Sequence, residues 1–214
     1  MSGDGEETPW LLYGAYGFTG RLIARRAIAM GLRPILAGRR REPTADLARE
    51  LDLECRVFDL DDPPALREGL RGVQLVMHTA GPFSRTWRPM AEACLAAGVH
   101  YLDITGEIEV FEALAGLDGA ARETGVMLLP GVGFDVVPTD CAAARVGGRL
   151  EEPVHLDLAF ASSGGPSRGT ALTMIEALGR PSRIRSGSRI VDVAWGSIAR
   201  TIPFSDGERH GVCI

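Results

Sequence analysis

The sequence of 214 residues predicts an α/β fold, in which a doubly wound parallel sheet is followed by the start of a smaller α+β domain. Short apolar runs such as Val73–Met77 are continuous rather than alternating, which is typical of strands buried on both faces of a sheet. These runs alternate with amphipathic segments, and repeated βαβ units form a parallel sheet with right-handed crossovers. After Leu150 the pattern changes, and polar and apolar residues begin to alternate.

Residues 1–150 are expected to form the sheet and its helices. The expected strands are residues 10–13, 33–37, 54–58, 73–78, 99–102 and 126–129. The expected helices are residues 18–30, 43–51, 63–70, 86–97, 107–124 and 137–146. Residues 151–214 are expected to hold a half-exposed strand at Val154–Ala161, a helix at Thr170–Leu178 and an arginine-rich, strand-like region. Because this pattern stops in mid-strand at Ile214, we expect a partial, truncated substrate domain.

The segment Tyr13–Gly20, YGAYGFTG, joins the first expected strand to the first expected helix. Gly14, Gly17 and Gly20 are spaced three apart within it. Glycines in such a turn let the backbone approach a pyrophosphate closely, and the free N–H groups at the helix start favour an anion. The pattern therefore predicts a dinucleotide-binding turn. A plain strand-to-helix connection is the alternative, and the flanking strand and helix favour the binding turn.

Arginines follow the second expected strand, in the segment Gly38–Arg41. An acidic residue at this point would accept hydrogen bonds from the ribose hydroxyls of NAD, and none is present. Arg39 and Arg40 suit a 2′-phosphate, because a guanidinium group pairs bidentately with phosphate oxygens. The sequence therefore favours NADP(H) over NAD as the cofactor. A solvated run of charge at a strand end is the alternative.

Residues that follow the third and fourth expected strands extend the predicted cofactor site. Asp59 would lie beside the adenine, whose amino group can donate to a carboxylate, and an aspartate that forms a turn is the alternative. Ala80 and Gly81 follow a central strand and are small enough for the nicotinamide ribose to approach. His78, in that strand, is expected to be a core residue rather than an acid or base.

Four carboxylates follow the fifth and sixth expected strands and are candidates for the substrate side of the cleft. They are Asp103, Glu107, Asp135 and Asp140. Carboxylates at this edge can orient a substrate or relay protons. Thr105–Glu107 and Pro138–Asp140 are also good helix starts, where an acidic residue offsets the helix dipole. We favour capping over chemistry for these residues, and no catalytic residue is assigned.

Composition argues against several other classes of function. The formal net charge of −5 gives no electrostatic footprint for nucleic acid. The four cysteines are scattered without a CxxC pair, so neither a metal site nor a disulfide framework is expected. The acidic, polar N-terminus does not resemble a signal peptide, and no apolar run is long enough to span a bilayer. We therefore expect a cytoplasmic protein without a transmembrane segment.

Five motifs resemble, in their order and spacing, the NADP-binding Rossmann domain of saccharopine dehydrogenase-like oxidoreductases, a family that includes trans-acting enoyl reductases. The motifs are GAYGFTG, LAGRR, TAGPF, YLDITGE and GVGFDVVPTD. The resemblance runs from Trp10 to Arg149 and continues more weakly through GGPSRGTALTMIEALG, which is similar to the family's second, mixed α+β domain. It implies cofactor contacts from the glycine turn with Tyr16, Phe18 and Thr19, from Arg39, Arg40 and Asp59, and from Ala80, Gly81, Pro82 and Phe83.

The resemblance also implies a reaction: hydride transfer between NADP(H) and a C=C or C=N bond of a small molecule, such as an enoyl lipid or an imine. Family members run well past 214 residues, so an NADP-binding regulator or truncated pseudoenzyme without turnover is the alternative. Exposed strand edges favour association, which leaves a homo-oligomer open. The chain contains no lysine, so the Tyr-x-x-x-Lys pair of short-chain dehydrogenases and a Schiff-base lysine are both excluded.

Overall fold

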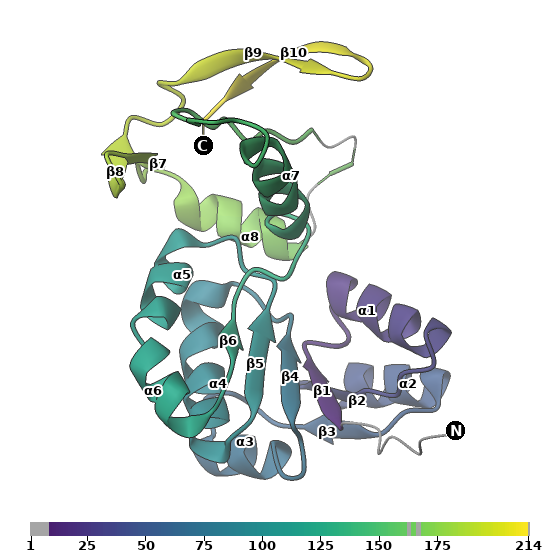
Figure 1. Cartoon of the computed structure of the whole chain (residues 1–214). Helices are drawn as coiled ribbons and strands as arrows, with labels where there is room; N and C mark the ends of the chain where they lie inside the picture. The colour runs from purple at the N-terminus through teal and green to yellow at the C-terminus, as the bar shows by residue number, and fades with distance from the viewer. Residues whose placement is uncertain (1–8, 162–163, 166–167, 214) are drawn as a thin grey trace, which may run out of the picture. The chain divides into compact units, whose positions relative to one another are not determined.

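The computed structural model describes residues 9–161, 164–165 and 168–213 of the chain. These residues divide into two compact units, and the division falls between Cys141 and Ala142 in the sequence. The first unit is built on a six-stranded sheet with helices on both faces, and the second contains two antiparallel strand pairs (Figure 1).

The sheet of the first unit is parallel throughout, with the strand order β3-β2-β1-β4-β5-β6. Its strands are β1 (Trp10–Tyr13), β2 (Ile35–Gly38), β3 (Cys55–Val57), β4 (Leu75–His78), β5 (His100–Asp103) and β6 (Leu128–Leu129). Strand β1 lies in the middle of the sheet, and from it the chain runs out to β3 and then crosses to β4. Tyr13 at the end of β1 is therefore paired with His78 at the end of β4. Doubly wound sheets bind their ligands at this reversal of strand order.

Helices follow the strands as predicted, and the two largest differences concern the helices expected at 86–97 and 107–124. Those of the first unit are α1 (Phe18–Ala29), α2 (Arg41–Leu51), α3 (Pro63–Gly69), α4 (Phe83–Ala97), α5 (Ile108–Ala115) and α6 (Asp118–Thr124), and α7 (Val137–Gly147) crosses the boundary. The prediction of a single helix at 107–124 is wrong, because Gly116 and Leu117 separate α5 from α6. Helix α4 begins at Phe83 rather than at residue 86, which brings its first turn to the carboxyl edge of the sheet.

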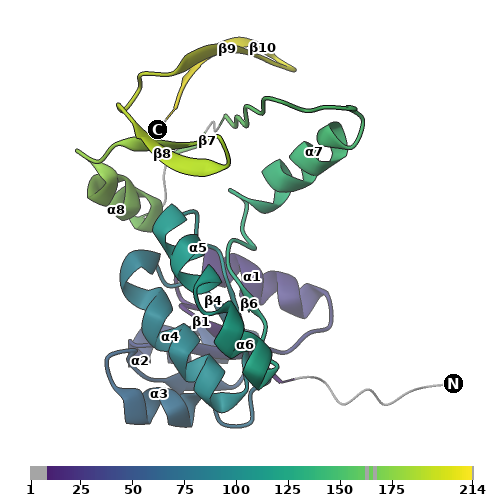
Figure 2. The same cartoon turned by 60° about the vertical axis from the view of Figure 1, so that its left-hand side comes forward.

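The two faces of the sheet carry different layers of helices (Figure 1). Leu12 and Leu36 point to one face and pack with residues of α1 and α2. Leu11 and Val76 point to the other face, where the larger core includes Trp87 of α4 and residues of α3 and α5. Helix α4 lies beside α5 and α6 in both views (Figures 1 and 2). Because side chains alternate along each strand, the sheet has a separate hydrophobic core on each of its two faces.

The second unit contains helix α8 (Arg168–Ala177) and four strands. Strands β7 (Ser182–Ser186) and β8 (Arg189–Val193) form one antiparallel pair, and β9 (Ala199–Phe204) and β10 (Gly207–Val212) form the other. Gly187 and Ser188 both have positive φ, as a two-residue hairpin turn requires. The predicted helix and arginine-rich strands of this region are confirmed.

The strand expected at Val154–Ala161 is wrong. Residues 153–161 are described as neither helix nor strand, and Val154 is 94% exposed. Alternating polarity predicts a strand only where a neighbouring strand pairs with it, and within the described ranges none does. Across those ranges, no helix is both long enough and apolar enough to pass through a membrane.

Candidate cofactor site

At the glycine turn after β1, four segments of the backbone lie close together. Gly14 has φ of +83°, and a Cβ at this position would lie 2.8 Å from the amide nitrogen of Ala80. The amide of Gly14 donates to the carbonyl of Ala37 at the end of β2, at 2.9 Å. A Cβ on Gly20 would lie 2.4 Å from the carbonyl oxygen of Gly14. The turn therefore joins β1, β2, β4 and α1, with no room for a side chain at Gly14 or Gly20.

The start of α1 is open. Gly17 is its N-cap residue and has no side chain that could accept from the first-turn amides, and the first turn of the helix contains no acidic residue. The side chain of Phe18 is 70% exposed, and the nearby Arg21 donates to the carbonyl oxygen of Tyr16 at 3.0 Å rather than to an acid. The N–H groups of the first turn and the helix dipole are thus available to an anion at this point.

Arg39 and Arg40 lie at the carboxyl end of β2, directly after Gly38. Both are exposed, and among the described residues neither forms an ion pair. The ring of Tyr16 covers Gly38, where a Cβ would meet it at 2.6 Å. Arg40 is the N-cap residue of α2, and its carbonyl accepts from the amide and from the hydroxyl of Thr44, at 3.3 and 2.7 Å. The two guanidinium groups are therefore free to meet a phosphate.

Asp59 lies in the loop after β3 and is exposed. Its Oδ1 accepts from the amide of Asp61 at 3.3 Å, which is the turn contact that the sequence offered as the alternative to an adenine contact. The neighbouring Phe58 carbonyl accepts from the hydroxyl of Tyr13 at 3.1 Å. This bond fixes the loop against the end of β1.

Thr79–Phe83, the segment after β4, is held by side chains from two sides. The hydroxyl of Thr79 donates to the carbonyl of Tyr13 at 2.8 Å, and that of Thr86 donates to the carbonyl of Ala80 at 2.7 Å. The Gly81–Pro82 peptide bond is cis. Phe83 is buried in the core, so of the four residues expected here it offers no side chain to a cofactor, and only Ala80, Gly81 and Pro82 remain accessible.

His78 is a core residue. It is fully buried, and its ring packs against those of Tyr13, Phe83 and Tyr101. Its Nε2 lies 3.1 Å from the hydroxyl oxygen of Thr86, whereas Nδ1 has no partner within the described part of the chain. Burial lowers the pKa of His78 to about 3, so the ring is neutral near neutral pH. A neutral, enclosed imidazole does not serve as a proton donor to substrate.

Asp103 is also buried and engaged. It accepts hydrogen bonds from the hydroxyl of Tyr101 at 2.6 Å, the amide of Thr105 at 2.9 Å and the amide of Gly131 at 3.0 Å. Burial raises the pKa of Asp103, and the three hydrogen bonds oppose that rise. Because it ties the loop after β5 to the loop after β6, Asp103 has a structural place rather than an open position in a cleft.

Glu107 does cap a helix, although not the one that the sequence indicated. It is the N-cap residue of α5, yet its carboxylate accepts from the amides of Phe83 and Ser84 at the start of α4, at 2.8 and 2.7 Å. Asp135 and Asp140 are exposed, and Asp140 lies in the first turn of α7. The four carboxylates thus do not form one cluster, and no group of three or more potential metal ligands occurs among the described residues.

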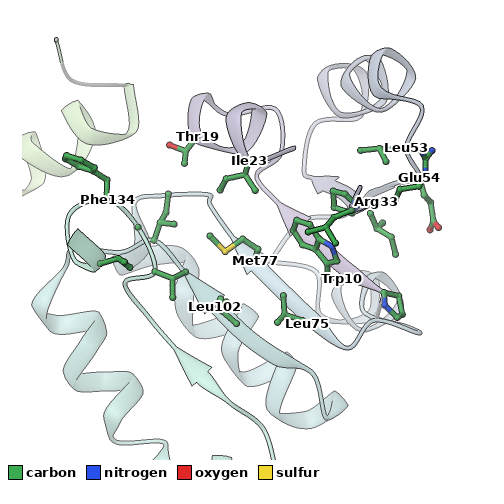
Figure 3. A pocket seen from close by; sticks show the side chains of 18 of the residues that line it. Trp10, Thr19, Ile23, Arg33, Leu53, Glu54, Leu75, Met77, Leu102 and Phe134 are labelled. Atoms are coloured by element: carbon green, nitrogen blue, oxygen red, sulfur yellow. The ribbon is translucent and has the colours of Figure 1, made fainter. Parts of the chain in front are cut away.

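A large apolar hollow lies elsewhere on the first unit, and the sequence did not predict it. Its volume is about 1210 Å³, and Figure 3 shows Trp10, Ile23, Met77, Leu102 and Phe134 around it. Of the predicted cofactor residues, the hollow's lining includes Thr19 and none of the others. The sequence shows only that these strands are apolar on both faces. In the structure, Leu75, Met77 and Leu102 are half-buried, whereas Val76 and Tyr101 on the other face are fully buried.

The turn, the open helix start and the reversal of strand order together define a Rossmann-type dinucleotide-binding domain. Residues 10–129 match the family described as the saccharopine dehydrogenase NADP binding domain. The chain therefore belongs to this family, and its cofactor is NADP(H).

Individual relatives agree with this assignment. The chain is 31% identical over 210 residues to a trans-acting enoyl reductase of Mycobacterium ulcerans, a match that covers 90% of this chain and 50% of the relative. It is 34% identical over 149 residues to a trans-acting enoyl reductase of Mycobacterium leprae, covering 65% of this chain and 35% of the relative. The chain spans about half the length of the curated relatives that it matches over 196 and 210 residues.

Among solved structures, apo saccharopine dehydrogenase from Saccharomyces cerevisiae shares the fold. The TM-score is 0.57 at 16% sequence identity, and the match covers 66% of this chain and 31% of that one. At this identity the likeness supports the fold alone.

Proposed function

We propose that this chain is the cofactor-binding part of an NADP(H)-dependent oxidoreductase that transfers hydride to or from a C=C or C=N bond. The observation that carries the proposal is the uncapped start of α1, placed directly behind a turn in which Gly14 and Gly20 leave no space for side chains. An anion-binding helix start at the ligand edge of a doubly wound sheet is the arrangement that binds a pyrophosphate.

Each part of the cofactor has a proposed set of contacts in the chain. The first-turn amides of α1, with Tyr16, Phe18 and Thr19 around them, bind the pyrophosphate. Arg39 and Arg40 bind the 2′-phosphate, and their exposure without ion pairs in the described chain supports this. Asp59 lies at the adenine, and Ala80, Gly81 and Pro82 at the nicotinamide ribose.

The nicotinamide supplies or accepts the hydride when it is bound. The chain's own contribution is to orient the cofactor and to hold the sheet edge rigid. Residues 1–150 are proposed as the cofactor domain, and residues 151–214 as part of a substrate domain. Because relatives that match most of this chain are named trans-acting enoyl reductases, we favour a C=C bond of an enoyl compound over the C=N bond of an imine.

A second candidate function is an NADP-binding regulator without turnover. The observation in its favour is the state of the candidate acids and bases at the sheet edge. His78 and Asp103 are fully buried, and Glu107 is hydrogen-bonded to the start of α4. None of these three is placed to exchange a proton with a substrate.

The experiment that separates the candidates is NADPH oxidation, followed by absorbance, with an enoyl thioester and with a cyclic imine as substrates. Oxidation that depends on the enoyl compound supports the proposed reaction, and oxidation that depends on the imine shifts the substrate class. Tight NADPH binding without oxidation by either substrate supports the regulator. No NADPH binding by the folded chain contradicts both candidates.

A further inference from the structure

We propose that Glu107 is a positioning residue, which holds the Ala80–Pro82 segment in place for the nicotinamide half of NADP(H). This inference rests on the proposed function, because it concerns how that site is built. Glu107 lies in the loop after β5, and Ala80–Pro82 lies in the loop after β4, the neighbouring strand.

The contact between Glu107 and α4 is bidentate. One carboxylate oxygen accepts from the amide of Phe83 and the other from the amide of Ser84. Pro82, the N-cap residue of α4, has no side chain that can accept these bonds, and the first turn contains no acidic residue. Without Glu107, two amides at a helix start would lose a charged acceptor, and the segment that enters α4 would lose its anchor.

Glu107 is itself held in place from the core. Its amide donates to the hydroxyl oxygen of Thr105 at 3.0 Å, and the amide of Thr105 donates to Asp103 at 2.9 Å. Asp103 and Thr105 are both buried. A continuous series of hydrogen bonds therefore leads from the end of β5 to the first turn of α4.

The held segment borders the pyrophosphate turn. The amide nitrogen of Ala80 lies only 2.8 Å from the position that a Cβ on Gly14 would take. The hydroxyl of Thr86 fixes the same segment from inside α4, since it bonds to the carbonyls of Ala80 and Pro82 at 2.7 and 3.2 Å. A shift of α4 would thus move Ala80 relative to Gly14, where the proposed cofactor crosses from its adenine half to its nicotinamide half.

The two helix starts at this edge of the sheet differ in a way that fits these roles. Within the described part of the chain, the first-turn amides of α1 have no side-chain acceptor, whereas Glu107 accepts from the amides at the start of α4. The carboxylate also places negative charge where a second phosphate would otherwise bind. The pyrophosphate is thereby directed to α1, and α4 keeps a structural role beside the nicotinamide.

The test compares two ligands by isothermal titration calorimetry. NADPH spans the whole site, whereas 2′,5′-ADP carries only the adenine half. We expect Glu107→Gln, which keeps one acceptor oxygen and loses the charge, to weaken NADPH binding roughly tenfold and to leave 2′,5′-ADP binding unchanged. Glu112→Gln removes the same charge at an exposed position of α5 and is the matched control, with wild-type affinity for both ligands.

Equal weakening for both ligands, or no weakening for either, would overturn the positioning role. A wild-type chain that binds neither ligand contradicts the proposed function itself, and the inference fails with it. If Glu107→Gln does not fold, Thr86→Val tests the second contact that holds the same segment, because it removes the hydroxyl that bonds to the carbonyl of Ala80. It also removes the partner of His78 Nε2, so Thr86→Ser is its control. Thr86→Ser keeps that hydroxyl, and we expect this variant to bind NADPH with the affinity of the wild type. Loss in both Thr86 variants would contradict the inference.

Discussion

The backbone of Gly20 packs directly on the carbonyl oxygen of Gly14, at a distance that excludes even a methyl group. A Cβ on Gly20 would also lie 2.8 Å from the Cα and carbonyl oxygen of Ala15. All three contacts are with backbone atoms, which cannot move aside as a flexible side chain would. The position of α1 behind the turn therefore depends on glycine at this point.

Gly20→Ala is expected to lower the free energy of unfolding by about 1–3 kcal/mol, because overpacking at a rigid backbone contact forces α1 away from the turn. NADPH binding should be lost together with the alignment of the first-turn amides. Thermal unfolding followed by circular dichroism measures the first effect, and calorimetry the second.

Gly119→Ala is the matched control, since nothing lies within 4 Å of a Cβ at this position of α6. Alanine is the better helix former there, so the change should leave stability unchanged or raise it by up to about 1 kcal/mol. A Gly20→Ala chain with wild-type stability and wild-type NADPH affinity would show that the contact is not required.

Arg39→Asp is expected to shift cofactor preference from NADPH towards NADH. Loss of a charge-assisted pair with the 2′-phosphate costs about 1.5–3 kcal/mol, or tenfold to hundredfold in affinity, and the new carboxylate repels the phosphate. Dissociation constants for both cofactors measure the shift. Arg145→Asp makes the same charge change at an exposed position of α7 and should keep the preference for NADPH. If the Arg39→Asp chain still prefers NADPH, Arg39 is a solvated surface charge and does not bind the 2′-phosphate.

Because His78 is buried in its neutral form, the free energy of unfolding is expected to fall on mild acidification. The ordinary pKa of His78, 6.5, applies in the unfolded chain, and burial lowers the folded value to about 3. Between these values the unfolded state takes up a proton that the folded state does not, so this stabilisation is full above pH 6.5 and is lost as pH falls. The expected loss is about 2 kcal/mol between pH 7 and 5.

The measurement is the free energy of unfolding in urea across that pH range, for the wild type and for His78→Leu. The variant lacks the titrating group, so its pH dependence should be shallower by the same amount, whatever its absolute stability. Parallel curves for the two proteins would contradict the buried, neutral state of His78.

The pair of Tyr101 and Asp103 should behave as one unit. In Asp103→Asn, the new amide oxygen can still accept from the amides of Thr105 and Gly131, but the buried Tyr101 hydroxyl loses its charged acceptor. This change is expected to lower the free energy of unfolding by about 1–3 kcal/mol. Tyr101→Phe removes the donor instead. Because both single changes break the same 2.6 Å bond, the double variant should cost less than their sum by about 0.5–3 kcal/mol. Strict additivity in urea unfolding would show that the bond does not couple them.

The first part of the fold could be predicted because its signals are local. Continuous apolar runs mark strands buried on both faces, and the spacing of Gly14, Gly17 and Gly20 marks a turn that only a strand and a helix can flank. The break at Gly116 was not predicted, because apolar residues recur at helical spacing on both sides of it. In the structure this glycine is the C-cap residue of α5. The strand at Val154–Ala161 was wrong, because pairing depends on a neighbour that no local pattern reveals.

The roles of the acidic residues were the least predictable part of the site. Glu107 precedes a helix, and the sequence correctly indicated a cap, but which helix it caps depends on how β4 and β5 are placed side by side. Asp103 likewise accepts a hydrogen bond from the amide of Gly131, which lies in another loop. These contacts join residues more than twenty positions apart, and charge and spacing along the chain do not encode them.

The central claim is that the turn after β1 and the arginines after β2 bind NADP(H). Its most direct test is thermal unfolding of the folded chain with saturating NADPH, with NADH and with neither. A ligand that binds only the native state raises stability by mass action, so we expect NADPH to raise the melting temperature clearly and NADH to raise it less. An unchanged melting temperature with NADPH, or a larger rise with NADH than with NADPH, would contradict the claim.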